Sequence, residues 1–221
     1  MSRRSRPNPL GDPDQCLVRP VAGVDEAGRG PLAGPVTAAA VIAPDGWTLE
    51  GLNDSKKLSE EQRDHLALQI RSSSGLVWAV GWASEEEIDR LNILQATFLA
   101  MRRALEGLVS APASVAVDGN RRIAGLDLTQ LPVVKGDGKI TSIAAASILA
   151  KTARDAWMVE HDTIYPGYGF AIHKGYPTPA HLEALERLGA CPIHRRSFGP
   201  VRRRVEILEL PIGTTSRSGS S

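Results

Sequence analysis

The sequence predicts an α/β protein built on a mixed, five-stranded sheet with helices packed against it. Three observations support this fold class. Short apolar runs alternate with longer amphipathic runs, two of the longer runs begin with helix-capping residues, and the first two apolar runs are joined by a short glycine-rich turn. A turn of this length is too short for a helical crossover, so it joins antiparallel strands and the sheet is not purely parallel. The 221 residues, 42% of them apolar, are enough for one sizeable core.

The expected strands are short apolar segments, and the last two end in aspartate followed by glycine, which is a common turn pair. The strands are expected in PVAGVDE (20–26), GPVTAAAVIA (34–43), VWAVGWA (77–83), SVAVDG (114–119) and LPVVKGDG (131–138).

Four helices are expected between and after these strands. The first two begin at capping boxes, in which Ser59 is followed by Gln62 and Ser84 by Glu87. The third is alanine-rich and can lie close to a sheet, and the last begins with a threonine cap and a proline in its first turn. Their ranges are 59–71, 84–108, 142–162 and 178–189.

Composition excludes several classes of protein. No apolar stretch is long enough to span a bilayer, and the basic start MSRRSRPNPLGDPDQ has no apolar run behind it, as a secretory signal would. Cys16 and Cys191 form neither a disulfide framework nor a metal-ligand spacing. We therefore expect a cytoplasmic protein with no membrane partner.

Charge is concentrated near the C-terminus. The net charge is only +1, but residues 187–204 hold six arginines and no acidic residue. Such a cluster can contact phosphates or form a solvated tail, and the sequence leaves both interpretations open.

Carboxylates stand at the ends of three expected strands. Asp25 and Glu26 end the first, Asp118 ends the fourth and Asp137 follows the fifth. Functional side chains collect at strand ends in α/β sheets, so neighbouring strands would bring these acids to one edge. Two carboxylates about 4 Å apart repel by roughly 4 kcal/mol at an effective dielectric near 20, so the cluster needs protons or a cation.

All-oxygen ligands favour Mg²⁺ or Mn²⁺, and such ions suit phosphoryl transfer. The alternative, that these are unrelated turn and capping acids, leaves Glu26 unexplained beside Asp25.

The glycines that follow the first strand suggest a close approach to a ligand. The run GRGPLAGP (28–35) lacks the spacing of a dinucleotide-binding motif, is interrupted by two prolines, and precedes a strand rather than a helix. The backbone of Gly28, Arg29 and Gly30 is better suited to touch a nucleic-acid sugar at short range.

Several segments, in order along the chain, resemble the bacterial ribonuclease HII family. They are GVDEAGRGPLAGPV (23–36), NDSKKLS (53–59), VDGN (117–120), KGDGK with SIAAASILAK (135–139 and 142–151), YPGYGF with HKGY (165–170 and 173–176) and CPIHRRSF (191–198).

The resemblance implies an RNase H-like sheet followed by a small helical C-terminal part. It implies an endonuclease that cuts RNA in RNA/DNA hybrids and cuts 5′ of ribonucleotides embedded in duplex DNA. The reaction would be metal-assisted hydrolysis with Mg²⁺ or Mn²⁺, leaving 3′-hydroxyl and 5′-phosphate ends. The expected organisation is a disordered tail (1–18), a catalytic domain (19–160), a substrate-binding region (161–211) and a second disordered tail (212–221).

The family's site residues map onto this sequence one by one. Its four catalytic and metal-binding acids correspond to Asp25, Glu26, Asp118 and Asp137. Its glycine–arginine–glycine element, which reads the 2′-hydroxyl and flanking phosphates, corresponds to Gly28, Arg29 and Gly30, and its junction-sensing tyrosine to Tyr176.

Basic residues elsewhere are candidate phosphate contacts, although each alone could be a solvated surface charge. We expect Ser147 to share a helix face with one of them, Lys151, four residues later. Three histidines, by contrast, are expected to be structural. The candidate contacts are Lys56, Lys57, Lys151, Arg195 and Arg196, and the histidines are His161, His173 and His194.

Two other functions stay open on the residues alone. A non-catalytic nucleic-acid-binding module would use the arginine cluster and need no divalent ion, but clustered acids would repel phosphate without metal. A phosphatase or another metal-dependent hydrolase could use a similar sheet. For the ribonuclease interpretation the expected partners are RNA/DNA hybrids and ribonucleotide-containing duplex DNA, bound by a monomer.

Overall fold

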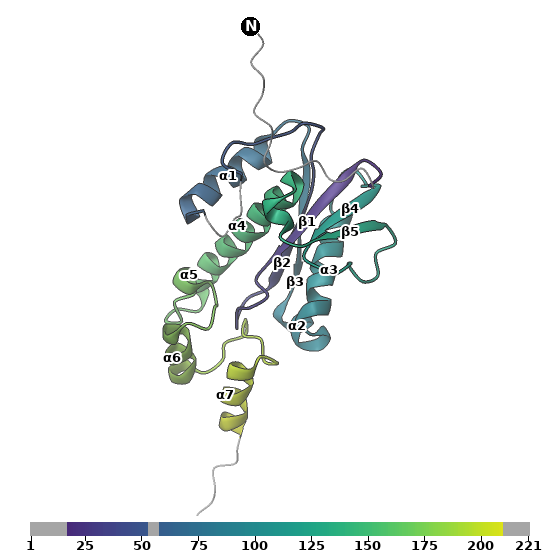
Figure 1. The fold of residues 1–221 in the computed structure, drawn as a ribbon. Helices are drawn as coiled ribbons and strands as arrows, with labels where there is room; N and C mark the ends of the chain where they lie inside the picture. The colour runs from purple at the N-terminus through teal and green to yellow at the C-terminus, as the bar shows by residue number, and fades with distance from the viewer. Residues whose placement is uncertain (1–16, 53–57, 210–221) are drawn as a thin grey trace, which may run out of the picture.

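A mixed five-stranded sheet in the order β3-β2-β1-β4-β5 organises the chain (Figure 1). The computed structural model describes residues 17–52 and 58–209. β1 pairs antiparallel with β2, and β2 with β3, whereas β4 runs parallel to β1 and β5 parallel to β4. The predicted hairpin and mixed sheet are therefore confirmed. The strands are β1 (Val21–Ala27), β2 (Val36–Ile42), β3 (Val77–Ala83), β4 (Ser114–Asp118) and β5 (Thr129–Val133).

Helices cover both faces of the sheet. α3 packs on β2 and β3, and α4 packs on β1 and β2 from the other side, with α1 against α4. The helices are α1 (Glu60–Ser72), α2 (Glu85–Leu91), α3 (Ile93–Glu106), α4 (Thr141–Ile164), α5 (Phe170–His173), α6 (Pro179–Leu188) and α7 (Gly199–Glu209), with a short 3₁₀ helix η2 (Gly136–Gly138) before α4.

The alternation of side chains along β2 produces two apolar layers. Ala38 and Ala40 belong to the core under α3, whereas Ala39 and Val41 belong to the core under α4. Small residues let α4 approach β1 closely, since a Cβ on Gly23 would lie 2.4 Å from main-chain atoms of α4. This close packing holds α4 next to the end of β1, where the candidate acids lie.

Most of the capping prediction is confirmed, and one helix is corrected. Both serine capping boxes form, and α6 begins at a threonine cap with proline in its first turn. The helix expected over 84–108 is instead two helices separated at Asn92. Asn92 has a φ of 70° and a ψ of 161°, a backbone conformation that residues other than glycine rarely adopt, and its side-chain oxygen caps α3 by accepting hydrogen bonds from the N–H groups of Leu94 and Gln95.

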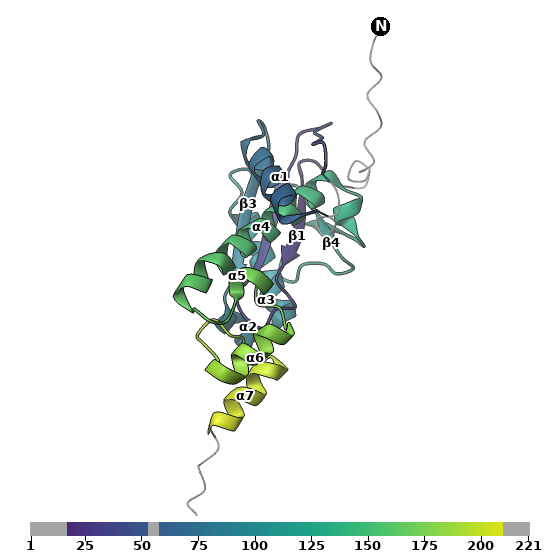
Figure 2. The same ribbon diagram turned by 90° about the vertical axis from the view of Figure 1, so that its left-hand side faces the viewer.

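The C-terminal helices α6 and α7 lie beyond one end of the sheet, and α5 packs against α4 (Figures 1 and 2). α4 runs from the sheet toward this part, so the expected boundary between residues 160 and 161 falls inside a continuous helix. The sequence predicts α6 as the last helix, but the structure has a further helix, α7, after it. Nearly all of both expected tails lies outside the described residues, and no described helix is long and apolar enough to cross a membrane.

Candidate active site

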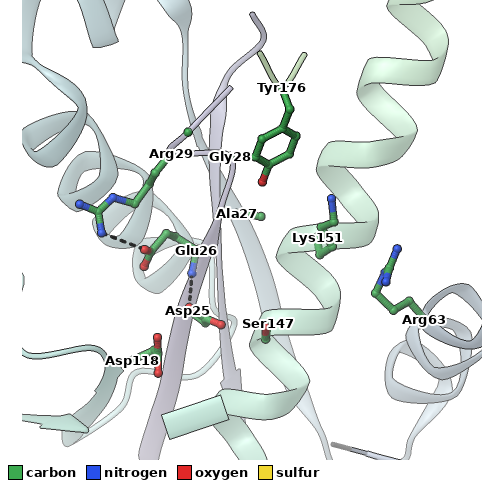
Figure 3. Close-up of a pocket in the computed structure, with 11 residues that line it drawn as sticks. Asp25, Glu26, Ala27, Gly28, Arg29, Arg63, Asp118, Ser147, Lys151 and Tyr176 are labelled. Carbon is green, nitrogen blue, oxygen red and sulfur yellow. Dashed lines mark hydrogen bonds and ion pairs between the residues drawn. The ribbon is translucent and has the colours of Figure 1, made fainter. Parts of the chain in front are cut away.

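A pocket of about 500 Å³ opens where β1 and β4 end (Figure 3). It combines residues from both strands, the loop after β1, α1, α4 and the segment after α5. Its lining residues are Asp25, Glu26, Ala27, Gly28, Arg29, Gly30, Arg63, Asp118, Ser147, Lys151 and Tyr176.

Strand register explains why acids from distant parts of the sequence meet here. Val24 of β1 is paired with Val117 of β4 in parallel, so Asp25 and Asp118 are the next residues at the same edge. Because side chains alternate along a strand, Asp25 points away from the Val24 side of β1 and toward α4. There it forms a hydrogen bond with the side chain of Ser147.

Asp25 is the most perturbed of these acids. Its side chain is buried, and one carboxylate oxygen accepts the main-chain N–H of Glu26 at 2.7 Å. Burial raises the pKa of Asp25 well above its usual value, and the charges of Glu26 and Asp118 raise it further. The hydrogen bonds that the protein gives the Asp25 carboxylate therefore do not offset the cost of its burial and its repulsion by neighbouring carboxylates.

Asp137 lies next to this group rather than in the pocket lining. It is buried in η2, directly after Gly136, whose N–H donates to an Asp118 carboxylate oxygen at 2.7 Å. That bond ties the end of β4 to η2. The structure thus brings Asp25, Glu26 and Asp118 to one pocket and places Asp137 beside it.

The donor set fits a hard divalent cation. Within residues 17–52 and 58–209, no three acidic, histidine or cysteine side chains are already arranged as a complete metal site. The pocket nevertheless offers carboxylate oxygens as potential metal ligands, and the described residues that line it include no histidine or cysteine. Asp25 is buried beside two like charges, those of Glu26 and Asp118. A cation of the Mg²⁺ or Mn²⁺ class would relieve that repulsion.

Basic side chains come from the helices across the pocket. Lys151 lies one turn after Ser147 on α4, and both line the cavity as their spacing predicts. Lys151 is 2.8 Å from Asp155 and 5.8 Å from the ring of Tyr176.

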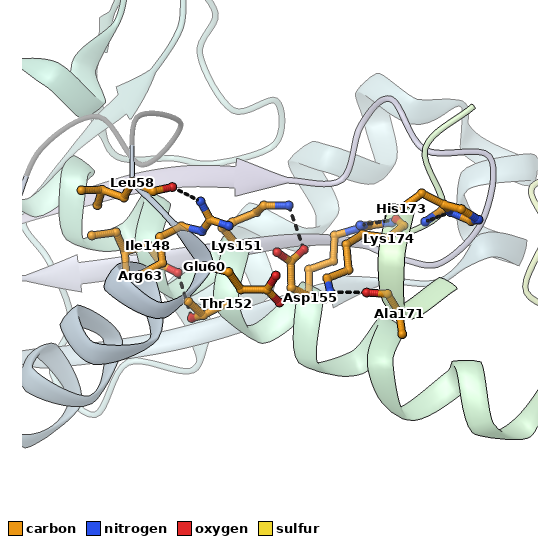
Figure 4. A network of polar contacts seen from close by, with 12 residues as sticks. Leu58, Glu60, Arg63, Ile148, Lys151, Thr152, Asp155, Ala171, His173 and Lys174 are labelled. Atoms are coloured by element: carbon orange, nitrogen blue, oxygen red, sulfur yellow. Dashed lines mark hydrogen bonds and ion pairs between the residues drawn. The ribbon is translucent and has the colours of Figure 1, made fainter. Parts of the chain in front are cut away.

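Arg63 of α1 also lines the pocket, although the sequence does not predict it, and it donates to the carbonyl of Leu58 at 2.6 Å (Figure 4). Its surroundings in the sequence are those of an ordinary solvated helix face, so no signal marks it. Nearby, Glu60 of the same helix is 3.1 Å from Lys174, which ties α1 to the segment that carries Tyr176 (Figure 4).

The three residues of the glycine loop, Gly28, Arg29 and Gly30, have different contacts in the pocket. The Arg29 guanidinium is half exposed and lies 3.2 Å from the Glu26 carboxylate. A Cβ on Gly30 would face the ring of Tyr176 at 3.5 Å. Gly28, by contrast, has a φ of +92° and packs directly on the buried side chain of Arg154.

Of the expected phosphate contacts, Arg195 is buried, Arg196 lies away from the pocket, and Lys56 and Lys57 are outside the described residues. Arg195 is fully buried and donates only to main-chain carbonyls, so it cannot meet a phosphate directly. Arg196 is exposed but is not among the pocket residues, and its N–H donates to Asp89. Lys56 and Lys57 lie outside the described residues.

A buried pair of histidines links the C-terminal segment to Tyr176. His194 Nδ1 accepts the Cys191 N–H at 3.0 Å, and its Nε2 is 3.1 Å from Nε2 of His181. His181 Nδ1 is 2.9 Å from the Tyr176 carbonyl. Since His194 Nδ1 accepts a hydrogen bond, its proton is on Nε2 and points at Nε2 of His181, and the proton of His181 is on Nδ1. A second proton on either ring would place two N–H groups against each other.

We expect the His194–His181 pair to weaken the fold in acid. Burial lowers the pKa of His194 to about 4, and it also lowers the pKa of His181. The unfolded chain therefore binds more protons between pH 6.5 and 4, so the free energy of unfolding falls as pH drops through this range, by roughly 3 kcal/mol for His194.

Urea unfolding at several pH values measures this slope. His194→Gln should flatten it, whereas His65→Gln, at an exposed position on α1, should leave it unchanged. The raised pKa of Asp25 makes the free energy of unfolding change with pH in the opposite direction. The effect of the histidine is therefore the difference in slope between wild type and His194→Gln. Equal slopes in wild type and His194→Gln would contradict the assignment.

Comparison with known proteins identifies the family of the chain. Residues 22–201 match the family model for ribonuclease HII. A ribonuclease HII of Laribacter hongkongensis (strain HLHK9) is 61% identical over 188 residues, covering 85% of this chain and 94% of that protein. One from Dechloromonas aromatica (strain RCB) is 62% identical over 188 residues, covering 85% and 95%.

Among solved structures, ribonuclease H2 from Pyrococcus horikoshii OT3 superposes with a TM-score of 0.68 at 28% identity. The match covers 85% of this chain and 97% of that one. The predicted RNase H-like fold class and enzyme class are confirmed, which sets aside the non-catalytic binding module. The chain belongs to the ribonuclease HII family and is an endoribonuclease of RNA/DNA hybrids.

Proposed function

We propose that this ribonuclease also cuts on the 5′ side of single ribonucleotides embedded in duplex DNA, leaving 3′-hydroxyl and 5′-phosphate ends. The observation that carries the proposal is the pocket itself. Carboxylates at the strand ends face basic residues on α1 and α4, and a glycine loop and Tyr176 complete the rim. One strand of a nucleic acid fits between such walls, with its phosphates near the basic side chains.

We assign cation binding to four acids. Asp25 is the central ligand, because it lies between Glu26 and Asp118 in the pocket, and Asp137 lies beside them. Bound Mg²⁺ or Mn²⁺ would supply Lewis-acid activation of the phosphate and of the attacking water. Ser147 orients the Asp25 carboxylate through its hydrogen bond.

Substrate choice depends on the 2′-hydroxyl, the group that distinguishes RNA from DNA at a given site. The loop at Gly28, Arg29 and Gly30 presents main-chain atoms to the pocket. Tyr176 is 41% exposed, so its ring is available to a sugar and its phenol to a hydrogen bond. Lys151 and Arg63 are placed to contact phosphates, and Arg196 stays a candidate for a more distant phosphate.

Replacing Tyr176 with Ala should weaken the preference for single ribonucleotides by about tenfold, the effect of one lost contact of this kind, with a smaller effect on long hybrids. Because the ring is partly exposed, the fold should be retained. The measurement is kcat/KM on a duplex with one ribonucleotide and on a continuous hybrid. A loss confined to the continuous hybrid would contradict this role.

The direct test of the proposed function is cleavage of a labelled DNA duplex containing one ribonucleotide, mapped to the nucleotide. We expect a cut 5′ of the ribonucleotide with Mg²⁺ or Mn²⁺ and no cut with EDTA. An all-DNA duplex of the same sequence is the control. Hydrolysis of a simple phosphomonoester without cleavage of either nucleic-acid substrate would favour a phosphatase instead.

We further propose that the enzyme works as a cytoplasmic monomer and that residues 161–211 form its substrate-binding region. Tyr176 supports the second statement, since it reaches the pocket from that part of the chain.

A further inference from the structure

Arg195 lies beneath the loop that forms the rim of the pocket. Its segment runs antiparallel beside the loop, with Ala33 bridged to His194, and its side chain is fully buried. The guanidinium donates to five main-chain carbonyls, those of Gly28 at 2.6 Å, Arg29 at 3.2 Å, Pro31 at 2.8 Å, Gly34 at 2.8 Å and Pro35 at 3.1 Å.

These hydrogen bonds fix the direction of the peptide groups on the rim. The peptide bonds after Gly28 and Arg29 are trans, so each carbonyl and the following N–H point in opposite directions. Since both carbonyls point toward Arg195, the N–H groups of Arg29 and Gly30 point away from it. In the described part of the chain, neither N–H donates to another main-chain carbonyl, and both residues line the pocket.

We propose that Arg195 is a positioning residue that aims the N–H groups of Arg29 and Gly30 at an oxygen of the sugar–phosphate backbone. The inference rests on the proposed function of the pocket. Successive N–H groups presented in this way bind an anionic or electron-rich oxygen. The acceptor is either the ribose 2′-hydroxyl or an adjacent phosphate, and the two are separated by the experiment below.

An arginine is required because of the number and geometry of its donors. Guanidinium carries five N–H groups in a planar fork, whereas a lysine ammonium carries three from one point. Arg195→Lys therefore retains a cation but cannot reach all five carbonyls. The loop would lose its fixed direction even if the protein folds.

Arg154 provides a matched control. It is also buried, and it donates to the carbonyls of Ala33, Pro35 and Lys174 but not to those of Gly28 or Arg29. Arg154→Lys thus removes buried hydrogen bonds to the same loop and to Lys174 and changes the packing beneath Gly28, but it leaves the carbonyls of Gly28 and Arg29 bonded to Arg195. A purely structural role predicts the same behaviour for both variants.

The test is the Kd for two duplexes that differ only in one ribonucleotide, measured with Mg²⁺ in an Asp118→Asn background. If the acceptor is the 2′-hydroxyl, Arg195→Lys should reduce the preference for the ribonucleotide duplex about tenfold, as expected for one lost hydrogen bond. If it is a phosphate, both affinities should fall about tenfold relative to Arg154→Lys. Equal Kd values for the two lysine variants on both duplexes would overturn the proposal.

A second measurement needs no change at Arg195. In the ¹⁵N-labelled protein with Asp118→Asn, the amide signals of Arg29 and Gly30 should shift when the ribonucleotide duplex is added. Unchanged signals at saturation would overturn the proposal even if Arg195→Lys does not fold. Failure of the proposed function itself would be seen separately, as absence of cleavage by the unsubstituted enzyme.

Discussion

Asp25→Asn is expected to reduce cleavage by about 10³-fold, equivalent to ~4 kcal/mol in the barrier, without destabilising the metal-free protein. Asn removes the charge that a divalent cation needs. It also removes a buried charge that lies beside Glu26 and Asp118 and whose burial already raises the pKa of Asp25. If activity is lost while the free energy of unfolding in EDTA is unchanged or higher, the Asp25 charge serves catalysis and does not stabilise the fold.

Single-turnover cleavage and urea unfolding measure the two effects. Asp127→Asn is the matched control, because Asp127 is exposed and precedes β5, at the opposite end of that strand from the pocket. The wild-type melting temperature should rise when Mn²⁺ is added, and Asp25→Asn should lose most of that rise. An active Asp25→Asn enzyme would contradict the role of this carboxylate.

Gly28→Ala should destabilise the protein by about 3 kcal/mol or more, through strain of a left-handed residue and overpacking. Gly28 has a φ of +92°, and a Cβ there would lie 2.1 Å from Nε of Arg154. That side chain cannot easily move, because it is fixed by three main-chain carbonyls.

Gly30→Ala is the paired comparison two residues away. A Cβ there would meet only the Tyr176 ring, at an ordinary 3.5 Å, so the fold should be retained. The added methyl group would instead stand between the loop and its substrate and reduce kcat/KM by about 10²-fold. Thermal unfolding and cleavage of a single-ribonucleotide duplex separate the two effects, and equal stability losses in both variants would contradict this distinction.

The elements that sequence alone could predict are those specified by local patterns. Serine capping boxes, the short turn between β1 and β2, and aspartates at the ends of β1 and β4 are all visible in short segments. The break at Asn92 was missed, because the apolar pattern continues through it and only the positive φ of that residue divides the helix.

Buried arginines show why part of the site could not be predicted. In sequence, Arg195 belongs to a basic cluster that suggests phosphate binding. Its actual partners are carbonyls about 160 residues earlier in the chain, which only the folded structure brings within reach. Arg154 and the pocket residue Arg63 are hidden for the same reason, because charge on a helix gives no indication of which face is covered.

The central claim is that carboxylates of β1 and β4 share a divalent cation. The most direct measurement is the anomalous scattering of Mn²⁺ soaked into crystals of the protein. We predict a manganese peak bonded to the Asp25 carboxylate and to at least one of Glu26 and Asp118. A fully active enzyme whose manganese lies away from Asp25 would contradict the account.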